Sequence, residues 1–256
     1  MMSLCAVVAL AISGVASASA SAFSPPEVGR CVKVAAGTGK MSSATCVKEK
    51  AKGSYEWMSG AVKGKFTSTG GVGVLAAVGG TTVVCKTEAS GGEYASPKTV
   101  TGVVVRFTSC ESAGFICATV GAKAGEIVTN SLEGKIGIEK RAFVEGKEVP
   151  LKTKLALDLF PTSADEGLYV TFNCGLSLHI TVGGSVLVPV TPTNKMLTKL
   201  TLKYVATKGV QKPTHFEGEP NDVLLTEINA KKPEQSGVTI TATQTGEEPL
   251  EVNTVF

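Results

Sequence analysis

Short β-like stretches recur every eight to twelve residues from Ala61 onward, and glycine, proline, asparagine or serine residues separate them. This spacing is typical of antiparallel sandwiches and barrels. Residues 151–159 and 174–182 alternate between apolar and polar side chains, which indicates strands with one solvent-facing side. The sequence therefore predicts an all-β fold of antiparallel sandwich or barrel-like sheets. We expect these sheets to form either one large domain or two packed β subdomains that divide near residue 145.

Residues 99–108 form the densest predicted strand of the first half. Val103, Val105 and Phe107 share one face, and residues 104, 106 and 108 share the other. Because apolar side chains occur on both faces, we expect a central strand that is nearly covered on both sides. Cys110 and Cys117 follow directly, and the next strand ends in a glycine-rich turn near residue 137. We interpret residues 99–137 as a hairpin closed by a disulfide.

Residues 1–22 have the features of a secretory signal peptide. They carry no charged side chain, their apolar run extends from Leu4 to about Val15, and they end in repeated Ala-Ser-Ala. Cleavage after Ala18, Ala20 or Ala22 would satisfy the small-x-small rule. The apolar run is shorter than the ~20 residues that a membrane-spanning helix needs. We therefore expect a secreted or cell-surface protein whose mature domain is residues 23–256, without a membrane span.

The expected mature chain contains an even number of cysteines, which in an exported protein indicates a disulfide framework. They are Cys31, Cys46, Cys85, Cys110, Cys117 and Cys174. Fifteen pairings are possible in principle. Pairing of sequence neighbours favours Cys31–Cys46 and Cys110–Cys117, which leaves Cys85–Cys174 as a long-range bridge. A zinc site is not expected, because the chain has no C-x-x-C motif and no histidine near a cysteine pair.

Charge and motifs disfavour several function classes. The net charge is +3 and is spread evenly, which does not favour nucleic-acid binding. The chain has neither a G-x-S-x-G motif nor a complete phosphate-binding loop, and its two histidines, His179 and His215, fit surface or loop roles. We therefore expect no cofactor, no metal ligand and no identifiable catalytic residue.

Tyr55 and Trp57 are the candidate ligand contacts. Two positions apart on a strand, they would project from one face and could stack on a sugar ring, although burial in a core is the alternative. A second pattern is the threonine row at positions 239, 241, 243 and 245. We interpret this row as the solvent face of a strand that buries Val238, Ile240 and Ala242.

Several stretches resemble a known group of proteins. They are VVVRFTSC, GFIC and GEIVTNSLEGKIG in the middle of the chain, together with GRCVKV, KEKAKGSYEW and GSVLVPVTP. The set is similar to exported, disulfide-containing, β-rich proteins of soil actinobacteria, over most of the expected mature chain. The resemblance implies a secreted, disulfide-bonded β protein. No activity is known for that group, so it implies no site residue.

These features lead us to expect a secreted or cell-surface structural or binding protein without catalytic activity. A cell-envelope glycan or another surface protein would be its partner. The alternative is an extracellular carbohydrate-active hydrolase that uses paired carboxylates from distant strands. A hydrolase should show two acidic groups that converge in a cleft. A binding or structural protein should show flat sheet faces and an exposed apolar or aromatic patch.

Overall fold

A computed structural model describes residues 26–60, 64–162, 167–220 and 223–254, so the expected signal peptide lies outside the described residues. The described chain is almost entirely β-strand, apart from loops and one 3₁₀ turn, η1 (Pro150–Lys152). Within these ranges, no helix has the length and hydropathy of a membrane span. The prediction of an all-β fold with three disulfides is confirmed.

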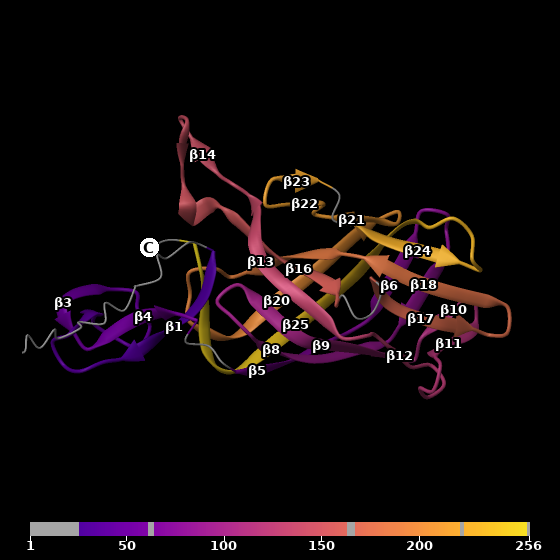
Figure 1. Cartoon of the computed structure of the whole chain (residues 1–256), viewed down its shortest axis with the longest axis horizontal. Helices are drawn as coiled ribbons and strands as arrows, with labels where there is room; N and C mark the ends of the chain where they lie inside the picture. Colours follow the sequence, from indigo (N-terminus) through magenta and orange to yellow (C-terminus); the bar gives the residue numbers. More distant parts are fainter. Residues whose placement is uncertain (1–25, 61–63, 163–166, 221–222, 255–256) are drawn as a thin grey trace, which may run out of the picture.

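Eight strands close into an antiparallel barrel (Figure 1). In order around the barrel they are β5 (Lys65–Gly70), β8 (Thr87–Tyr94), β9 (Thr99–Thr108), β13 (Leu132–Lys140), β16 (Lys154–Pro161), β19 (Val186–Thr191), β20 (Leu197–Thr207) and β25 (Glu234–Asn253). Pairing of β25 with β5 closes the ring, so no strand of the ring is left with a free edge.

A second set of strands extends the same walls at one end, on the right in Figure 1. It consists of β6 (Gly73–Ala77), β7 (Thr82–Cys85), β10 (Glu111–Ser112), β11 (Phe115–Thr119), β12 (Ile127–Val128), β17 (Leu168–Cys174), β18 (Leu178–Gly184) and β24 (Leu224–Ile228). Lys86 alone separates β7 from β8, and Ser185 alone separates β18 from β19. β6 and β24 both pair with β25, so the extension is closed as well. The result is one long barrel.

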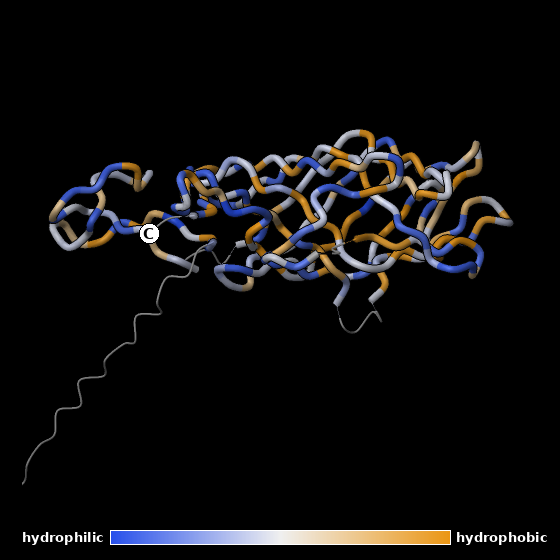
Figure 2. The backbone as a smooth tube through the Cα atoms, turned by 90° about the horizontal axis from the view of Figure 1, so that it is seen from above, coloured by the Kyte–Doolittle hydropathy of each residue, from blue (hydrophilic) through white to orange (hydrophobic). Residues whose placement is uncertain are grey.

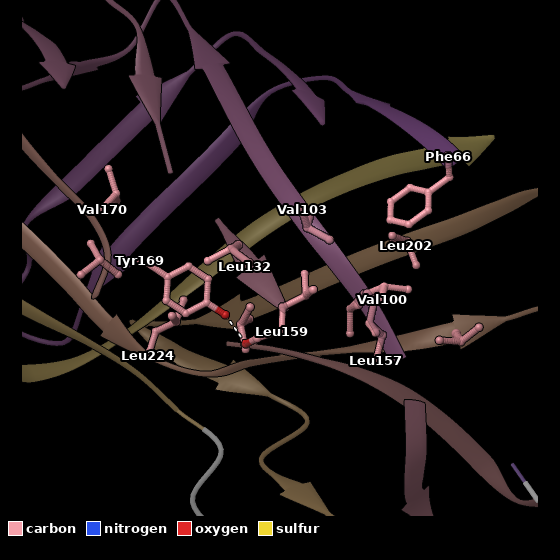
Figure 3. Close-up of a cluster of buried hydrophobic side chains, with 14 of the residues drawn as sticks. Phe66, Val100, Val103, Leu132, Leu157, Leu159, Tyr169, Val170, Leu202 and Leu224 are labelled. Atoms are coloured by element: carbon pink, nitrogen blue, oxygen red, sulfur yellow. Dashed lines mark hydrogen bonds between the residues drawn. The ribbon is translucent and has the colours of Figure 1, made fainter. Parts of the chain in front are cut away.

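Hydrophobic and hydrophilic residues alternate along the barrel strands (Figure 2). Because successive side chains of a strand point to opposite faces, this alternation places apolar side chains in the barrel interior. The side chains of Val100, Leu132, Leu157 and Leu202 come from four different strands and converge in the interior (Figure 3). On β25, Ile240 and Ala242 are buried and Val238 is half-buried, while the threonines at 239, 241 and 243 are exposed. The interpretation of the threonine row is therefore confirmed at these three positions, while Thr245 is half-buried.

The strand predicted for residues 99–108 forms as β9, but the expectation that both its faces are covered is wrong. Val104 is 38% exposed, and the Arg106 guanidinium makes an ion pair of 2.6 Å with Glu126 on the outer surface. In a closed barrel of this kind the inner face of each wall strand faces the core, and the outer face meets water unless another segment covers it.

Two segments lie outside the barrel wall. The strands β21 (Val210–Lys212), β22 (His215–Phe216) and β23 (Glu219–Pro220) form an excursion between β20 and β24, and Phe216 packs on the outward side chains of Ala156 and Leu187. A hairpin of β14 (Phe143–Val144) and β15 (Lys147–Glu148) projects between β13 and β16 (Figure 1). Residue 145 lies in the turn of this hairpin, and a domain division there stays a prediction.

A small N-terminal sheet lies at the other end of the barrel, on the left in Figure 1. It contains β1 (Glu27–Lys33), β2 (Gly39–Met41), β3 (Glu49–Gly53) and β4 (Tyr55–Ser59). β1 also pairs with the end of β25, from Glu27 opposite Asn253 to Gly29 opposite Glu251. The last strand of the barrel therefore connects the N-terminal sheet to the barrel.

The disulfide Cys31–Cys46 is confirmed, but the pairings Cys110–Cys117 and Cys85–Cys174 are wrong. The bridges join Cys85 to Cys110 and Cys117 to Cys174, with Cα–Cα distances of 4.0 and 3.9 Å. Cys110 and Cys117 do lie opposite each other, because the Cys117 N–H donates to the Cys110 carbonyl at 2.9 Å. In antiparallel sheets, hydrogen-bonded pairs stay about 5.5 Å apart and non-hydrogen-bonded pairs approach to about 4.5 Å. The bridges thus form across the closer neighbours.

Candidate functional site

A cavity of about 140 Å³ lies inside the barrel. Its walls are mostly apolar, with contributions from Leu75, Val103, Val105, Phe107, Leu202 and Ile240 among others. Eight-stranded barrels are just wide enough for side chains to fill the interior or for one small ligand to be held there. In this barrel, the inward-facing side chains leave part of the interior unfilled.

Seven polar side chains interrupt the apolar lining. They are Ser68 on β5, Glu88 and Ser90 on β8, Thr129 after β12, Tyr169 on β17, Tyr204 on β20 and Gln244 on β25. Strand register explains why the first three gather, since Ser68 pairs with Ser90 and Glu88 pairs with Gly70 across β5 and β8. Gln244 is satisfied, because its Nε2 donates to the Tyr94 hydroxyl at 2.6 Å.

The Glu88 carboxyl lies over Gly70, where a side chain would take its place. A Cβ at Gly70 would come within 2.8 Å of Glu88 Oε2. The Ser90 hydroxyl hydrogen-bonds the carboxyl, but Oε2 and the Ser68 Oγ have no hydrogen-bond partner among the described residues. Glu88 is 6% exposed and Ser68 is 4% exposed. Buried polar atoms without a partner cost about 1–3 kcal/mol each.

Burial sets the electrostatics of this group. Desolvation raises the pKa of Glu88, and the hydrogen bond from Ser90 acts in the opposite direction. Burial raises the pKa of Tyr204 as well, and the nearby charge of Glu88 adds to that effect. The cavity lining contains no lysine, arginine or histidine among the described residues. A charged Glu88 therefore has no cationic partner in the cavity wall, which favours its neutral form.

The cavity offers binding groups rather than a set of catalytic groups. Glu88 is the one carboxylic acid among its described lining residues, so the paired carboxylates expected of a hydrolase do not converge there. In the part of the chain that the structure describes, no three histidine, cysteine, aspartate or glutamate side chains gather in a metal-binding arrangement. What the cavity supplies is a mostly apolar space in which two hydrogen-bonding atoms without a partner, Ser68 Oγ and Glu88 Oε2, lie on neighbouring strands.

A second hollow, of about 240 Å³, has a different character. It is lined by Pro26, Ile138, Arg141, Glu148, Thr153, Leu155 and Thr254. Its acidic group, Glu148, accepts a hydrogen bond of 2.8 Å from Arg141 and is satisfied by it. Because charge and counter-charge already meet in this hollow, it offers fewer unmet groups to a ligand than the barrel interior does.

Tyr55 and Trp57 lie on β4 in the N-terminal sheet and do not line the barrel cavity. Both are half-buried. The Trp57 ring covers Gly29, where a Cβ would come within 2.5 Å of the ring, and its side chain hydrogen-bonds the Glu251 carboxyl. Burial raises the pKa of Glu251 to about 6, and this hydrogen bond opposes the rise. Trp57 thus connects the N-terminal sheet to β25, and a role of either residue in ligand contact stays a prediction.

Sequence reasoning did not find Ser68, Glu88 or Tyr204. The segment TEASGGEY at residues 87–94 has few β-branched residues, so it did not stand out as a strand. The sequence did contain one signal, the period-two spacing of side chains along a strand. Glu88, Ser90 and Tyr94 are an even number of positions apart and therefore share one face of β8. Comparison of the chain with known protein families, with curated proteins and with solved structures finds no match.

Proposed function

We propose that the protein is a secreted, non-enzymatic binding protein that holds a small apolar ligand inside its barrel. The observation that carries this proposal is the mostly apolar cavity of about 140 Å³ that the barrel strands line. Cavities of about 150 Å³ lined by aliphatic and aromatic side chains stay dry and bind benzene-sized molecules. The ligand would therefore be of about that size, with apolar surface as its main contact.

Export is part of the same proposal. Three disulfides suit an oxidising compartment. The signal-like residues 1–22 and the resemblance to exported actinobacterial proteins support secretion independently of the barrel. Mass spectrometry of the culture medium of a cell expressing the full chain tests this point, and retention of the whole uncleaved chain inside the cell would contradict it.

Binding is favoured over hydrolysis by the composition of the cavity wall. A glycoside hydrolase needs two carboxylic acids on either side of the scissile bond. The described lining residues supply Glu88 alone, in a mostly apolar surface that has few groups for a sugar's hydroxyls. A concave, mostly apolar cavity with a few polar groups is the usual form of a small-molecule binding site.

The test is an NMR titration of the disulfide-intact protein with toluene. We expect the amide signals that shift to come from strands that line the cavity. Ala242→Leu adds bulk to the cavity lining and should weaken toluene binding at least tenfold. Thr243→Leu places the same side chain on the exposed face of the same strand and serves as the matched control. Equal toluene binding by both variants, or no binding by the unmodified protein, would overturn the proposal.

A further inference from the structure

The lining atoms that lack a hydrogen-bond partner lie together on two paired strands, β5 and β8. Thr129, Tyr169 and Gln244 lie elsewhere on the wall and are hydrogen-bonded within the protein. Ser68 and Ser90 pair across β5 and β8, and Glu88 follows on the same inward face, opposite Gly70. The neighbouring walls are apolar, since Glu88 pairs with Phe107 on its other side and Ile240 lies next to Gly70. A ligand in this cavity would therefore meet unpartnered hydrogen-bonding atoms on the β5 and β8 side and mostly apolar side chains elsewhere.

Two of these polar atoms have unmet hydrogen-bonding capacity. Glu88 Oε2 and Ser68 Oγ are buried and have no partner among the described residues. The space that the carboxyl occupies exists because residue 70 is glycine, since a Cβ there would come within 2.8 Å of Oε2. Nearly all buried polar atoms in folded proteins are hydrogen-bonded, so an unmet pair that lines a cavity indicates a ligand group.

The chemistry of the two atoms selects the ligand group. With the proton of the neutral carboxyl on Oε1, toward Ser90, Glu88 Oε2 can accept a hydrogen bond, and the Ser68 hydroxyl can donate one. A hydroxyl group on the ligand would satisfy both, because it has one O–H to donate and lone pairs to accept. An ammonium group has no acceptor and would leave the Ser68 donor unmet. A carboxylate has no proton to donate to Glu88 Oε2, and its charge would have no cation among the described lining residues to offset it.

We propose that the barrel ligand is a small apolar molecule with a single hydroxyl group, an alcohol or phenol, which donates to Glu88 Oε2 and accepts from Ser68 Oγ. This inference rests on the proposed function, because it assumes that the barrel holds a ligand. It adds a specific polar contact and an orientation, with the hydroxyl toward β5 and β8 and the hydrocarbon toward Phe107 and Ile240.

The experiment measures the affinities of phenol, toluene and benzoate for the disulfide-intact protein by NMR titration. Phenol and toluene have nearly the same size, so the ratio of their affinities reports the hydroxyl contact. We expect Glu88→Met to lower the phenol-to-toluene ratio about tenfold, the effect of one buried hydrogen bond. Glu93→Met makes the same change on the exposed face of the same strand and should leave the ratio unchanged. Benzoate should bind more weakly than phenol.

Ser68→Ala provides a second measurement that does not depend on the folding of the Glu88 variant. It removes the donor with little change in volume and should lower the phenol-to-toluene ratio several-fold. If toluene binds and the ratio is the same in the unmodified protein, Glu88→Met and Ser68→Ala, the hydroxyl contact is wrong while the proposed function stands. If neither toluene nor phenol binds, the proposed function fails and the contact fails with it. Tighter binding of benzoate than of phenol would also overturn the contact.

Discussion

Glu251 should make the protein less stable as the pH rises through about 6, and Glu251→Gln should remove this dependence. Its carboxyl is buried where β25 meets the N-terminal sheet, with the Trp57 side chain and the Asn253 amide as hydrogen-bond donors. Burial raises its pKa from 4.5 to about 6. The substituted amide keeps an oxygen to accept from Trp57, so the change removes the charge and preserves the shape.

The sign follows from proton binding. Between about pH 4.5 and 6, the folded protein holds a proton on Glu251 that the unfolded chain has released, so stability falls as the pH rises through this window. At about 1.4 kcal/mol per pKa unit, the rise corresponds to about 2 kcal/mol. Screening by solvent at the edge of the barrel reduces this to about 1 kcal/mol. The two proteins should have similar stability at pH 4, and Glu251→Gln should be more stable by about 1 kcal/mol at pH 8.

Urea unfolding at pH 4, 6 and 8 measures the effect, with the free energy of unfolding compared at each pH. Glu133→Gln removes the same charge from an exposed position on β13 and controls for the change in net charge. Glu88 titrates in both proteins and cancels in the comparison. A difference between Glu251→Gln and the unmodified protein that stays constant from pH 4 to pH 8 would refute the reasoning.

Two further predictions concern the framework of the barrel. Replacing Cys117 and Cys174 together by alanine should lower the free energy of unfolding by about 4 kcal/mol, because their bridge spans 57 positions. Peptide mapping without reduction should recover the Cys117–Cys174 pair. Recovery of a Cys110–Cys117 peptide would contradict the structure. Gly134→Ala should cost about 1–3 kcal/mol in urea unfolding, because the new Cβ would lie within 2.6 Å of Val100. Gly71→Ala, where nothing lies within 4 Å, is its control, and equal losses for both variants would argue against this packing.

The sequence predicted what depends on local pattern. Alternation at residues 174–182 indicated a strand correctly only from Leu178 to Val182, because residues 175–177 form a turn after β17 and Leu176 is exposed. The even number of cysteines after residue 22 correctly indicated three bridges. The local sequence pattern could not predict which cysteines pair, because Cys110 lies beside two other cysteines on adjacent strands. Which neighbour it bonds depends on the hydrogen-bond register, and register is set by the whole sheet.

The local sequence pattern also could not predict that the barrel closes or that it contains a cavity. A sandwich and a barrel share the same alternation, and the pairing of β25 with β5 that separates them joins segments far apart in the sequence. Glu88 could not be recognised from the sequence for the same reason. An acidic residue on the inward face of a strand points to a site only when that strand is known to line a cavity. The expectation of two covered faces for β9 failed because it assumed a sheet packed between layers.

The position of the closing strand has a consequence for how this protein is made. β25 completes the barrel with β5 and β6 on one side and with β20 and β24 on the other, and it is synthesised after all four of these partners. Until it emerges, both sides of the seam are open edges with unpaired backbone groups. A chain that stalls before residue 234 therefore exposes two templates for strand pairing with other chains, and these edges need protection until β25 has emerged.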